Sequence, residues 1–255
     1  MMSNVKLKYL ITYLLSEHPE WNDLVLPTNE SEQFRLYRSL VNIRLAKKAS
    51  AEYLKAEDTF LQGLIARKGI TDIADLQPVE KNIYLWKGDI TTLKCGAIVN
   101  AANSGMTGCY QPCHNCIDNC IHTFAGIRLR LKCAEIIKAQ GHEELTGTAK
   151  ITPAYNLPCD YVIHTVGPIV QSRLTQKHCE LLKSCYESCL ELAMQSGVKS
   201  IAFCCISTGV FGFPQDKAAE IAVQTVREFL KSHDIEVICN VFTEKDYKIY
   251  SRLFE

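Results

Sequence analysis

The sequence predicts an α/β fold in three layers, with helices on both faces of a central mixed sheet and a small helical segment before it. From about residue 82 onward, short and nearly continuous apolar runs alternate with helical patterns, which is typical of a sheet covered on both faces. Before that point the chain shows helical spacing and no convincing strand. With 47% hydrophobic and 22% charged residues, a chain of 255 residues can bury the core that such a fold needs.

The first segment, residues 1–78, is expected to form a helical extension. Its apolar residues recur at three- and four-residue spacing, which places them on one helical face. Asn29 is a suitable N-cap for a second helix, and Gly69 is a suitable end for a third. The expected helices cover residues 7–15, 31–45 and 50–67. Because no catalytic constellation is visible here, we expect the extension to have a packing role.

Residues 79–255 are expected to form the main domain. The expected strands cover residues 83–86, 97–99, 148–152, 161–166, 200–206 and 236–242. The expected helices cover residues 118–139, 176–195 and 214–232, with a further helix at the C-terminus. In sheets of this kind, ligands gather at the loops that leave the carboxyl ends of the strands. A functional site is therefore expected in those loops.

The charge balance argues against nucleic acid or an anionic membrane as a partner, because 28 basic residues are matched by 28 acidic ones. The apolar run near the N-terminus is short, is interrupted by Thr12 and Tyr13, and lacks a small-residue cleavage site, so we expect no signal peptide. No stretch of the sequence approaches the roughly 18 apolar residues of a membrane span. We therefore expect a cytoplasmic protein.

Thirteen cysteines in such a chain indicate reduced thiols, packing or metal ligands rather than a disulfide framework. Most of them lie in apolar strands or along helical patterns, where cysteine acts as a small buried hydrophobe. The segment from Gly108 to Cys116, with the sequence GCYQPCHNC, is different, because it concentrates cysteine and histidine in one loop.

Short motifs in and around the strand-end loops carry the most information. A glycine-containing loop that runs into a helix, such as Ser207–Pro214, suits a bound phosphate. The motifs are, in order, GDIT (88–91), AIVNAAN (97–103), IDNCIH (117–122), VIHTVGP (162–168) and ISTGVFGFP (206–214). Together they resemble the macrodomain family, which binds ADP-ribose. The resemblance covers about residues 82–255 and leaves the helical extension outside it.

The resemblance implies a role for each loop. Asp89 would accept a hydrogen bond from the exocyclic amine of adenine, with Ile90 beside it, and Asn103 would bind the distal ribose. The diphosphate would be wrapped by Ser207, Thr208, Gly209, Val210, Phe211 and Gly212, with Phe211 beside the distal ribose. Each of these residues also has a structural alternative. Asp89 would cap a turn, Asn103 would be an ordinary turn residue, and Phe211 would pack in the core.

One departure from the family pattern indicates a sub-family. Most macrodomains carry a run of glycines where this chain has GCYQPCHNC, and the spacing is similar to that of the zinc-containing macrodomains of bacteria. That resemblance makes Cys109, His114 and Cys116 the ligands of a zinc ion, and three ligands with an open fourth position are typical of catalytic zinc. Cys113 and Cys120 are competing thiols, the first directly before His114 and the second expected inside a helix. The alternative is a cluster of reduced cysteines with no metal.

Asp118 aligns with the acidic residue that catalytic macrodomains carry near the distal ribose. There it would orient the attacking water or polarise a ribose hydroxyl. Its alternative role is to cap the helix that follows. His122 and His164 lie in the matching stretches, and we interpret both as structural.

The sequence is therefore interpreted as a zinc-dependent hydrolase that removes mono-ADP-ribose from protein side chains. Resemblance to the zinc sub-family further implies a partner of the lipoyl-carrier type, modified by a sirtuin-like transferase. Two alternatives stay open: a non-catalytic ADP-ribose-binding module with a structural zinc, and a deacetylase of O-acetyl-ADP-ribose. A zinc-stabilised RNA-binding domain is disfavoured by the neutral charge.

Overall fold

The computed structural model describes residues 2–21 and 23–255, so Met1 and Asn22 of the expected helical extension lie outside the described residues. The extension consists of helices α1 (Met2–Ser16), α2 (Glu30–Ile43) and α3 (Ala51–Lys68). The side chain of Asn29 accepts a hydrogen bond from the backbone N–H of Ser31 at 2.8 Å and caps α2 as predicted. Gly69, with a φ of +90°, ends α3.

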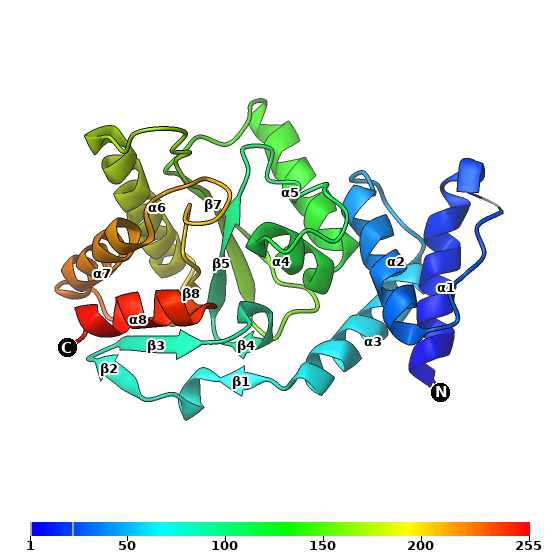
Figure 1. The fold of residues 1–255 in the computed structure, drawn as a ribbon, viewed down its shortest axis with the longest axis horizontal. Helices are drawn as coiled ribbons and strands as arrows, with labels where there is room; N and C mark the ends of the chain where they lie inside the picture. The colour runs from blue at the N-terminus through cyan, green and yellow to red at the C-terminus, as the bar shows by residue number, and fades with distance from the viewer. Residues whose placement is uncertain (1, 22) are drawn as a thin grey trace.

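The three helices enclose a small core of their own. Leu7, Leu10 and Leu14 of α1 are buried against aromatic residues of the other two helices. Phe34 and Leu64 also pack against the larger core of the main domain, so the two cores meet. Figure 1 shows the three helices at one end of the molecule, beside α4 (Ile117–Ala125) and α5 (Ile127–Gln140). The predicted helical extension is thus confirmed as a set of helices.

A seven-stranded mixed sheet forms the centre, with the strand order β2-β3-β9-β8-β5-β7-β6. Its strands are β2 (Pro78–Glu80), β3 (Ile83–Lys87), β5 (Ala97–Ala102), β6 (Ala149–Pro153), β7 (Tyr161–Val166), β8 (Ser200–Phe203) and β9 (Glu236–Val241). The inner strands run parallel, and β2 and β6 pair antiparallel at the two edges. The predicted mixed sheet is confirmed, with the short edge strand β2 as an addition. A separate parallel pair joins β1 (Thr71–Asp72) to β4 (Leu93–Lys94).

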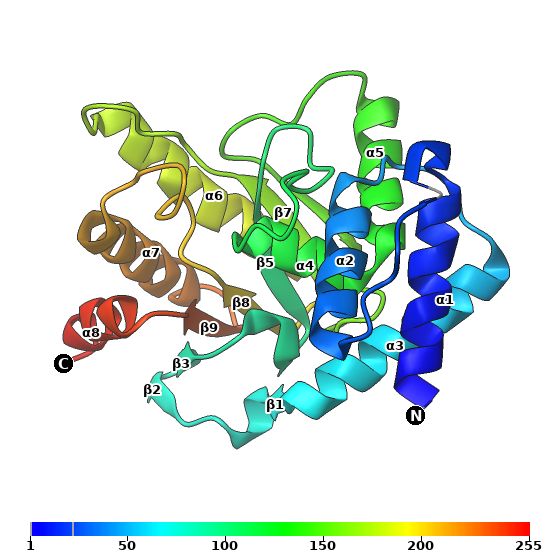
Figure 2. The same ribbon diagram turned by 45° about the vertical axis from the view of Figure 1, so that its right-hand side comes forward.

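Helices cover the sheet in two layers. In both ribbon views, α6 (Gln176–Gln195), α7 (Gln215–Leu230) and α8 (Glu244–Leu253) lie on one side of the strands, and α4 and α5 lie on the other (Figures 1 and 2). Helices α2 and α3 of the extension pack against α4, so the extension adds further helices on that side of the sheet only (Figure 2). Among the described residues, no helix is long and apolar enough to cross a membrane.

The prediction of one helix over residues 118–139 is wrong, because the chain breaks at Gly126 into α4 and α5. Gly126 has a φ of +93°, and a Cβ atom there would lie 2.7 Å from Oε2 of Glu57. That same oxygen accepts a hydrogen bond from the backbone N–H of Ile127 at 3.1 Å. A carboxylate from α3 therefore provides the acceptor at the first turn of α5, which the local sequence pattern cannot reveal.

The strand expected over residues 200–206 is also shorter than predicted. It ends at Phe203, and Cys204 to Ile206 continue as irregular chain into the following loop. These residues stay largely buried, which explains why an apolar run suggested a longer strand. Because Ala202 pairs with Ile98 and β5 continues to Ala102, the loop after β8 begins before the carboxyl edge that β5 reaches.

Candidate active site

A cleft with a cavity volume of about 1330 Å³ lies where β3, β5, β8 and β9 end. Most of the residues singled out from the sequence line it: Asp89, Ile90, Asn103, Cys109, His114, Cys116, Asp118, Ser207, Thr208, Gly209, Val210 and Phe211. Gly212 is outside the lining. Its φ is +69°, and a Cβ atom there would lie 2.8 Å from the carbonyl oxygen of Val170, so Gly212 shapes the loop from behind.

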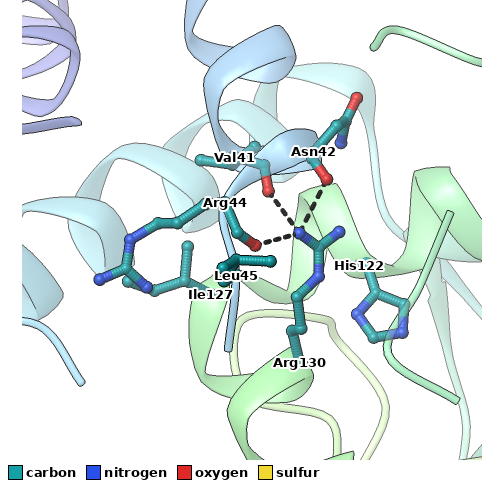
Figure 3. A pocket seen from close by; sticks show the side chains of 8 residues that line it. Val41, Asn42, Arg44, Leu45, His122, Ile127 and Arg130 are labelled. Carbon is teal, nitrogen blue, oxygen red and sulfur yellow. Dashed lines mark hydrogen bonds between the residues drawn. The ribbon is translucent and has the colours of Figure 1, made fainter. Parts of the chain in front are cut away.

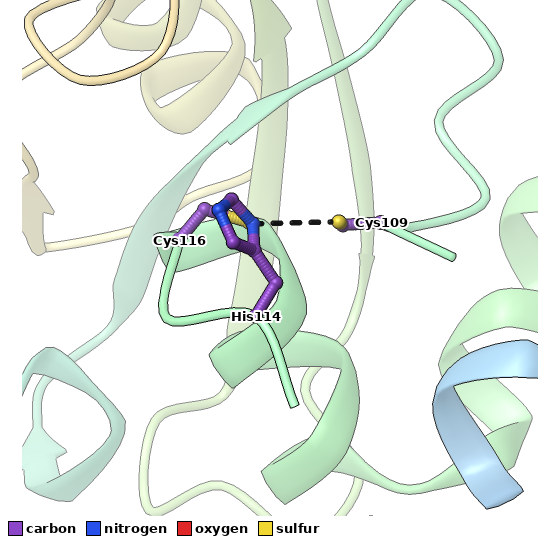
Figure 4. Close-up of side chains that lie close together, drawn as sticks. All are labelled: Cys109, His114 and Cys116. Carbon is purple, nitrogen blue, oxygen red and sulfur yellow. Dashed lines mark hydrogen bonds between the residues drawn. The ribbon is translucent and has the colours of Figure 1, made fainter. Parts of the chain in front are cut away.

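The loop before α4 gathers two thiols and an imidazole. One donor atom each from Cys109, His114 and Cys116 lies within 4.8 Å of the others. The Cys109 sulfur is 3.6 Å from Nδ1 of His114 (Figure 4). Zinc–sulfur and zinc–nitrogen bond lengths place donors roughly 3.5–4 Å apart around a tetrahedral ion. The spacing and chemistry of this donor set therefore fit zinc.

The two competing thiols point toward helix α2. The sulfur of Cys113 is 3.2 Å from Oγ of Ser39, and the sulfur of Cys120 is 3.6 Å from Nη2 of Arg38. Cys113 has a φ of +55°, a backbone conformation that is disfavoured for residues other than glycine. The turn at Cys113 thus separates its own thiol from the imidazole of His114.

Asp118 lies in the first turn of α4, next to the thiols, and is 5% exposed. Its Oδ1 accepts a hydrogen bond from Nδ2 of Asn100 at 2.8 Å, and its Oδ2 accepts one from Nδ2 of Asn103 at 3.3 Å. Burial raises the pKa of Asp118 to about 6, although these hydrogen bonds and the charge of Arg130 act in the opposite direction. The carboxyl group is thus held at the cleft wall with both oxygens fixed.

The alternative role of Asp118 as the helix cap is wrong. The N-cap of α4 is Cys116, whose sulfur accepts a hydrogen bond from the backbone N–H of Asn119 at 3.4 Å. The acidic side chain sits two residues further on, where its charge still favours the amino-terminal end of the helix.

Asn100, for which no role was predicted, contacts Asp118 through the 2.8 Å hydrogen bond described above. It is fully buried on β5 and also lies 3.1 Å from Nδ1 of His164. His164 is buried as well, and burial lowers its pKa to about 3, so its ring is neutral. A buried asparagine inside an apolar strand was the signal that could have found this support, since such a group needs partners.

Asp89 lies at the end of β3 and has two roles. Its Oδ1 caps the short helix Ile90–Thr92 by accepting a hydrogen bond from the backbone N–H of Thr91 at 3.0 Å. Its Oδ2 accepts one from Nζ of Lys68 at 2.7 Å. Burial acts to raise the pKa of Asp89, but the hydrogen bonds and charge of Lys68 and the contacts of Thr91 bring it below its usual value. Asp89 therefore presents an ionised carboxylate to the cleft.

The loop after β8 carries a strained serine. Ser207 is buried with a φ of +64°, and its Oγ has no hydrogen-bond partner among the described residues. A Cβ atom on Gly167 would lie 2.0 Å from that oxygen, so only glycine fits beneath it. The loop is held by the backbone N–H of Val170, which donates to the carbonyl of Phe211 at 2.8 Å. The hydroxyl oxygen is shielded from solvent, so Ser207 shapes the loop from within, and the exposed residues Gly209 and Val210 form its outer surface.

The extension also reaches the cleft, which sequence analysis missed. Phe34, Arg38 and Lys68 belong to α2 and α3, and all three line the cavity. Nζ of Lys68 is 3.6 Å from the ring centroid of Phe124 on α4, in addition to its contact with Asp89. Charged residues on a helix are usually solvated, so their spacing alone gave no indication of this position.

The chain is similar to macrodomain proteins both in sequence and in structure. Residues 99–222 match the model of the Macro domain family. The chain is 58% identical over 251 residues to a protein of Treponema medium named protein-ADP-ribose hydrolase, with 96% of each chain covered. It is 51% identical over 259 residues to a protein of the same name from Staphylococcus aureus, with 99% of this chain and 96% of the other covered.

Among solved structures, the Trypanosoma brucei macrodomain in complex with ADP-ribose is similar, at 31% sequence identity and a TM-score of 0.67. The match covers 86% of this chain and 95% of that one.

Proposed function

This chain belongs to the macrodomain family, and from that premise we propose that it is a zinc-dependent hydrolase that removes mono-ADP-ribose from modified protein side chains. Relatives that are 50–58% identical are named protein-ADP-ribose hydrolases, which supports the removal of ADP-ribose as its activity. The finer parts of the proposal are the zinc ion, the mono-ADP-ribosyl substrate and the roles of individual residues.

The cleft has the features that ADP-ribose requires. Asp89 offers an acceptor to the exocyclic amine of adenine, since an ionised carboxylate only accepts hydrogen bonds. The loop from Ser207 to Gly212 would wrap the diphosphate and offers it the exposed backbone at Gly209. The similar structure from Trypanosoma brucei, solved with ADP-ribose, supports this choice of ligand.

The single observation that carries the zinc proposal is the cluster of Cys109, His114 and Cys116 on the wall of this same cleft, beside Asp118. The three side chains would hold the ion and leave a fourth position open. Zinc there would supply Lewis acidity and positive charge at the distal-ribose end of the ligand.

The chain's own residues would then prepare the bond for cleavage. Asn103 would hold the distal ribose, and the carboxyl group of Asp118 lies beside it, joined to the Asn103 side chain by a hydrogen bond of 3.3 Å. Asp118 would orient the water that attacks the anomeric carbon of the distal ribose and accept its proton at a carboxylate oxygen. The bond from that carbon to the protein side chain breaks, and the side chain leaves with the electron pair and takes up a proton. Asn100 would keep that carboxylate in place from below, through its 2.8 Å contact with Oδ1.

A release assay tests the proposal. Zinc-loaded protein is mixed with a mono-ADP-ribosylated protein, preferably a carrier of the lipoyl type, and free ADP-ribose is measured with and without a chelator. We expect release that the chelator abolishes and added zinc restores. If the release of ADP-ribose is unaffected by full removal of zinc, the proposed dependence on zinc is wrong. Binding of ADP-ribose without release from aspartyl-, glutamyl-, seryl- or arginyl-linked substrates would indicate a binding module instead.

A further inference from the structure

Helix α2 of the extension contacts the loop of residues 109–116, and we propose that its residues Arg38 and Asn42 are positioning residues that fix the conformation of this loop. The inference rests on the proposed function, in which this loop holds zinc. It assigns the helical extension a part in the active site, beyond the packing role that the sequence suggested.

Arg38 joins the loop to helix α4. Its Nη2 donates to the carbonyl oxygen of His114 at 2.7 Å and to Oδ1 of Asn119 at 3.0 Å. A guanidinium group has several donors in one rigid plane, so it can fix two acceptors relative to each other. Because the carbonyl belongs to a proposed zinc ligand, Arg38 fixes the backbone from which the imidazole projects.

Asn119 extends this contact to the start of the loop. It is fully buried, and its Nδ2 donates to the carbonyl of Gln111 at 3.0 Å and to that of Cys109 at 3.3 Å. With its oxygen bound to Arg38 and its nitrogen bound to the loop, the amide has a single orientation. The backbone of both Cys109 and His114 is therefore tied to the same guanidinium.

Asn42 holds the turn in the middle of the loop. It is 1% exposed, its Oδ1 accepts from the backbone N–H of Cys113 at 2.9 Å, and its Nδ2 donates to Oγ1 of Thr123 at 3.0 Å. Cys113 has the disfavoured φ of +55° noted above, and it directly precedes His114. A strained residue keeps its conformation only where its surroundings fix it, and Asn42 provides one such contact.

Arg130 of α5 anchors the end of α2 from which Asn42 projects. Its Nη1 donates to the carbonyls of Val41 at 3.0 Å and Asn42 at 2.8 Å, and also to that of Arg44 (Figure 3). The last carbonyls of a helix carry partial negative charge, which a buried cation stabilises. Helix α2 is thus fixed against the main domain at one end, and one face of the helix contacts the loop of residues 109–116.

The test compares four full-length variants with the wild type. Arg38→Met and Asn42→Ala remove the contacts, Arg38→Lys keeps the charge but loses the planar fork, and Arg35→Ala removes an exposed arginine from the same helix. Zinc affinity is measured by competition with a chromophoric chelator, and the ligand geometry by the absorption spectrum of the cobalt-substituted protein. Amide hydrogen exchange of residues 109–116 reports the loop itself, and circular dichroism confirms the fold.

We expect Arg38→Met and Asn42→Ala each to weaken zinc binding by about ten- to a hundredfold, as the loss of residues that orient metal ligands commonly does. The loop amides should exchange faster, Arg38→Lys should be intermediate, and Arg35→Ala should match the wild type. If the wild type binds zinc and both variants bind it equally well with unchanged exchange, the inference is wrong and the proposed function stands. If the wild type binds no zinc, the proposed cofactor is wrong, and the exchange of the loop amides alone decides whether α2 positions the loop.

Discussion

Lys68 and Asp89 form an ion pair between the last turn of α3 and the end of β3, with 2.7 Å between Nζ and Oδ2. The lysine also lies over the ring of Phe124, so its ammonium group is fixed between the extension and the main domain. The pair keeps the carboxylate ionised at the place where adenine is proposed to bind. The extension therefore contacts the cleft at Asp89 and, through Arg38 and Asn42 of α2, also contacts the loop of residues 109–116.

We expect Asp89→Ala to weaken ADP-ribose binding and to leave zinc content unchanged. Loss of a hydrogen bond to a charged acceptor costs about 1.5–3 kcal/mol, which is roughly ten- to a hundredfold in affinity. Isothermal titration calorimetry on folded, zinc-replete protein measures the change. Asp72→Ala is a matched control, because Asp72 also pairs with a lysine at 2.7 Å but lies outside the cleft lining. An unchanged dissociation constant for Asp89→Ala would leave this residue with its capping role alone.

Purified protein should contain close to one zinc ion per chain. Substitution of Cys109, His114 or Cys116 by alanine should remove the ion, because each donor atom belongs to the same cluster. Cys113→Ala should retain zinc, since its thiol contacts Ser39 of α2, and Cys179→Ala on α6 should do so as well. Metal analysis after dialysis decides the question. Loss of zinc from Cys113→Ala, together with full zinc in Cys109→Ala, would show that the ligand assignment is wrong.

Asp118→Ala should slow turnover far more than it weakens binding. A group that acts on the transition state changes the rate of release with little effect on ground-state affinity. The variant should therefore keep zinc and ADP-ribose binding while single-turnover release from a mono-ADP-ribosylated protein falls. Cys109→Ala should likewise bind ADP-ribose and lose most release. Equal losses of affinity and rate in Asp118→Ala would contradict a catalytic role.

Because of Glu57, the protein should become less stable as the pH rises from about 4.5 to about 7. Burial raises its pKa to about 7, against hydrogen bonds from Tyr37, Ile127 and Tyr53 that lower it. Between these two pKa values the folded chain keeps a proton that the unfolded chain has lost. The resulting contribution to the free energy of unfolding is fully present below about pH 4.5, the pKa of the unfolded chain. It decreases as the pH rises and is gone at about pH 7, the pKa of the folded chain. The shift corresponds to about 3 kcal/mol.

Urea unfolding of the wild type and of Glu57→Gln between pH 5 and 8 measures this contribution. Glutamine can keep the contacts with the tyrosine hydroxyls and the Ile127 amide but does not titrate. We expect the free energy of unfolding of the wild type, relative to the variant, to fall with rising pH. Taking this difference removes the effect of other buried groups, such as His164, whose lowered pKa acts in the opposite direction. Parallel curves for the two proteins would refute the prediction.

The order of helices and strands could be predicted because their local signals agree with the fold. Helix α6 begins after its N-cap Thr175 and ends just before Gly197, so its predicted bounds of 176–195 are those observed. The break at Gly126 could not be predicted in the same way. It depends on a carboxylate from α3 that lies 70 residues earlier in the chain, whereas the apolar pattern continues across the glycine.

In the candidate site, too, some residues could be predicted from the sequence and others could not. The residues of the strand-end loops were predictable because the carboxyl ends of parallel strands meet at one edge of a sheet. Arg38 was not, because its contact with His114 joins residues 76 positions apart across two units of the chain. A sequence motif records which residues are neighbours along the chain, and helix α2 becomes a neighbour of the loop of residues 109–116 only once the chain has folded.

The hydrogen-bond acceptor that Glu57 provides at the break between α4 and α5 bears on whether the two parts of the chain unfold together. A chain that began at residue 79 would leave the Ile127 amide and the Arg130 guanidinium without the partners that they have here. Such a chain would also lose Phe34 and Leu64, which pack against the core of the main domain, so the helices next to the extension would lose both hydrogen bonds and apolar packing. The boundary near residue 78 divides the sequence into two patterns, but we expect both parts to unfold in a single thermal transition.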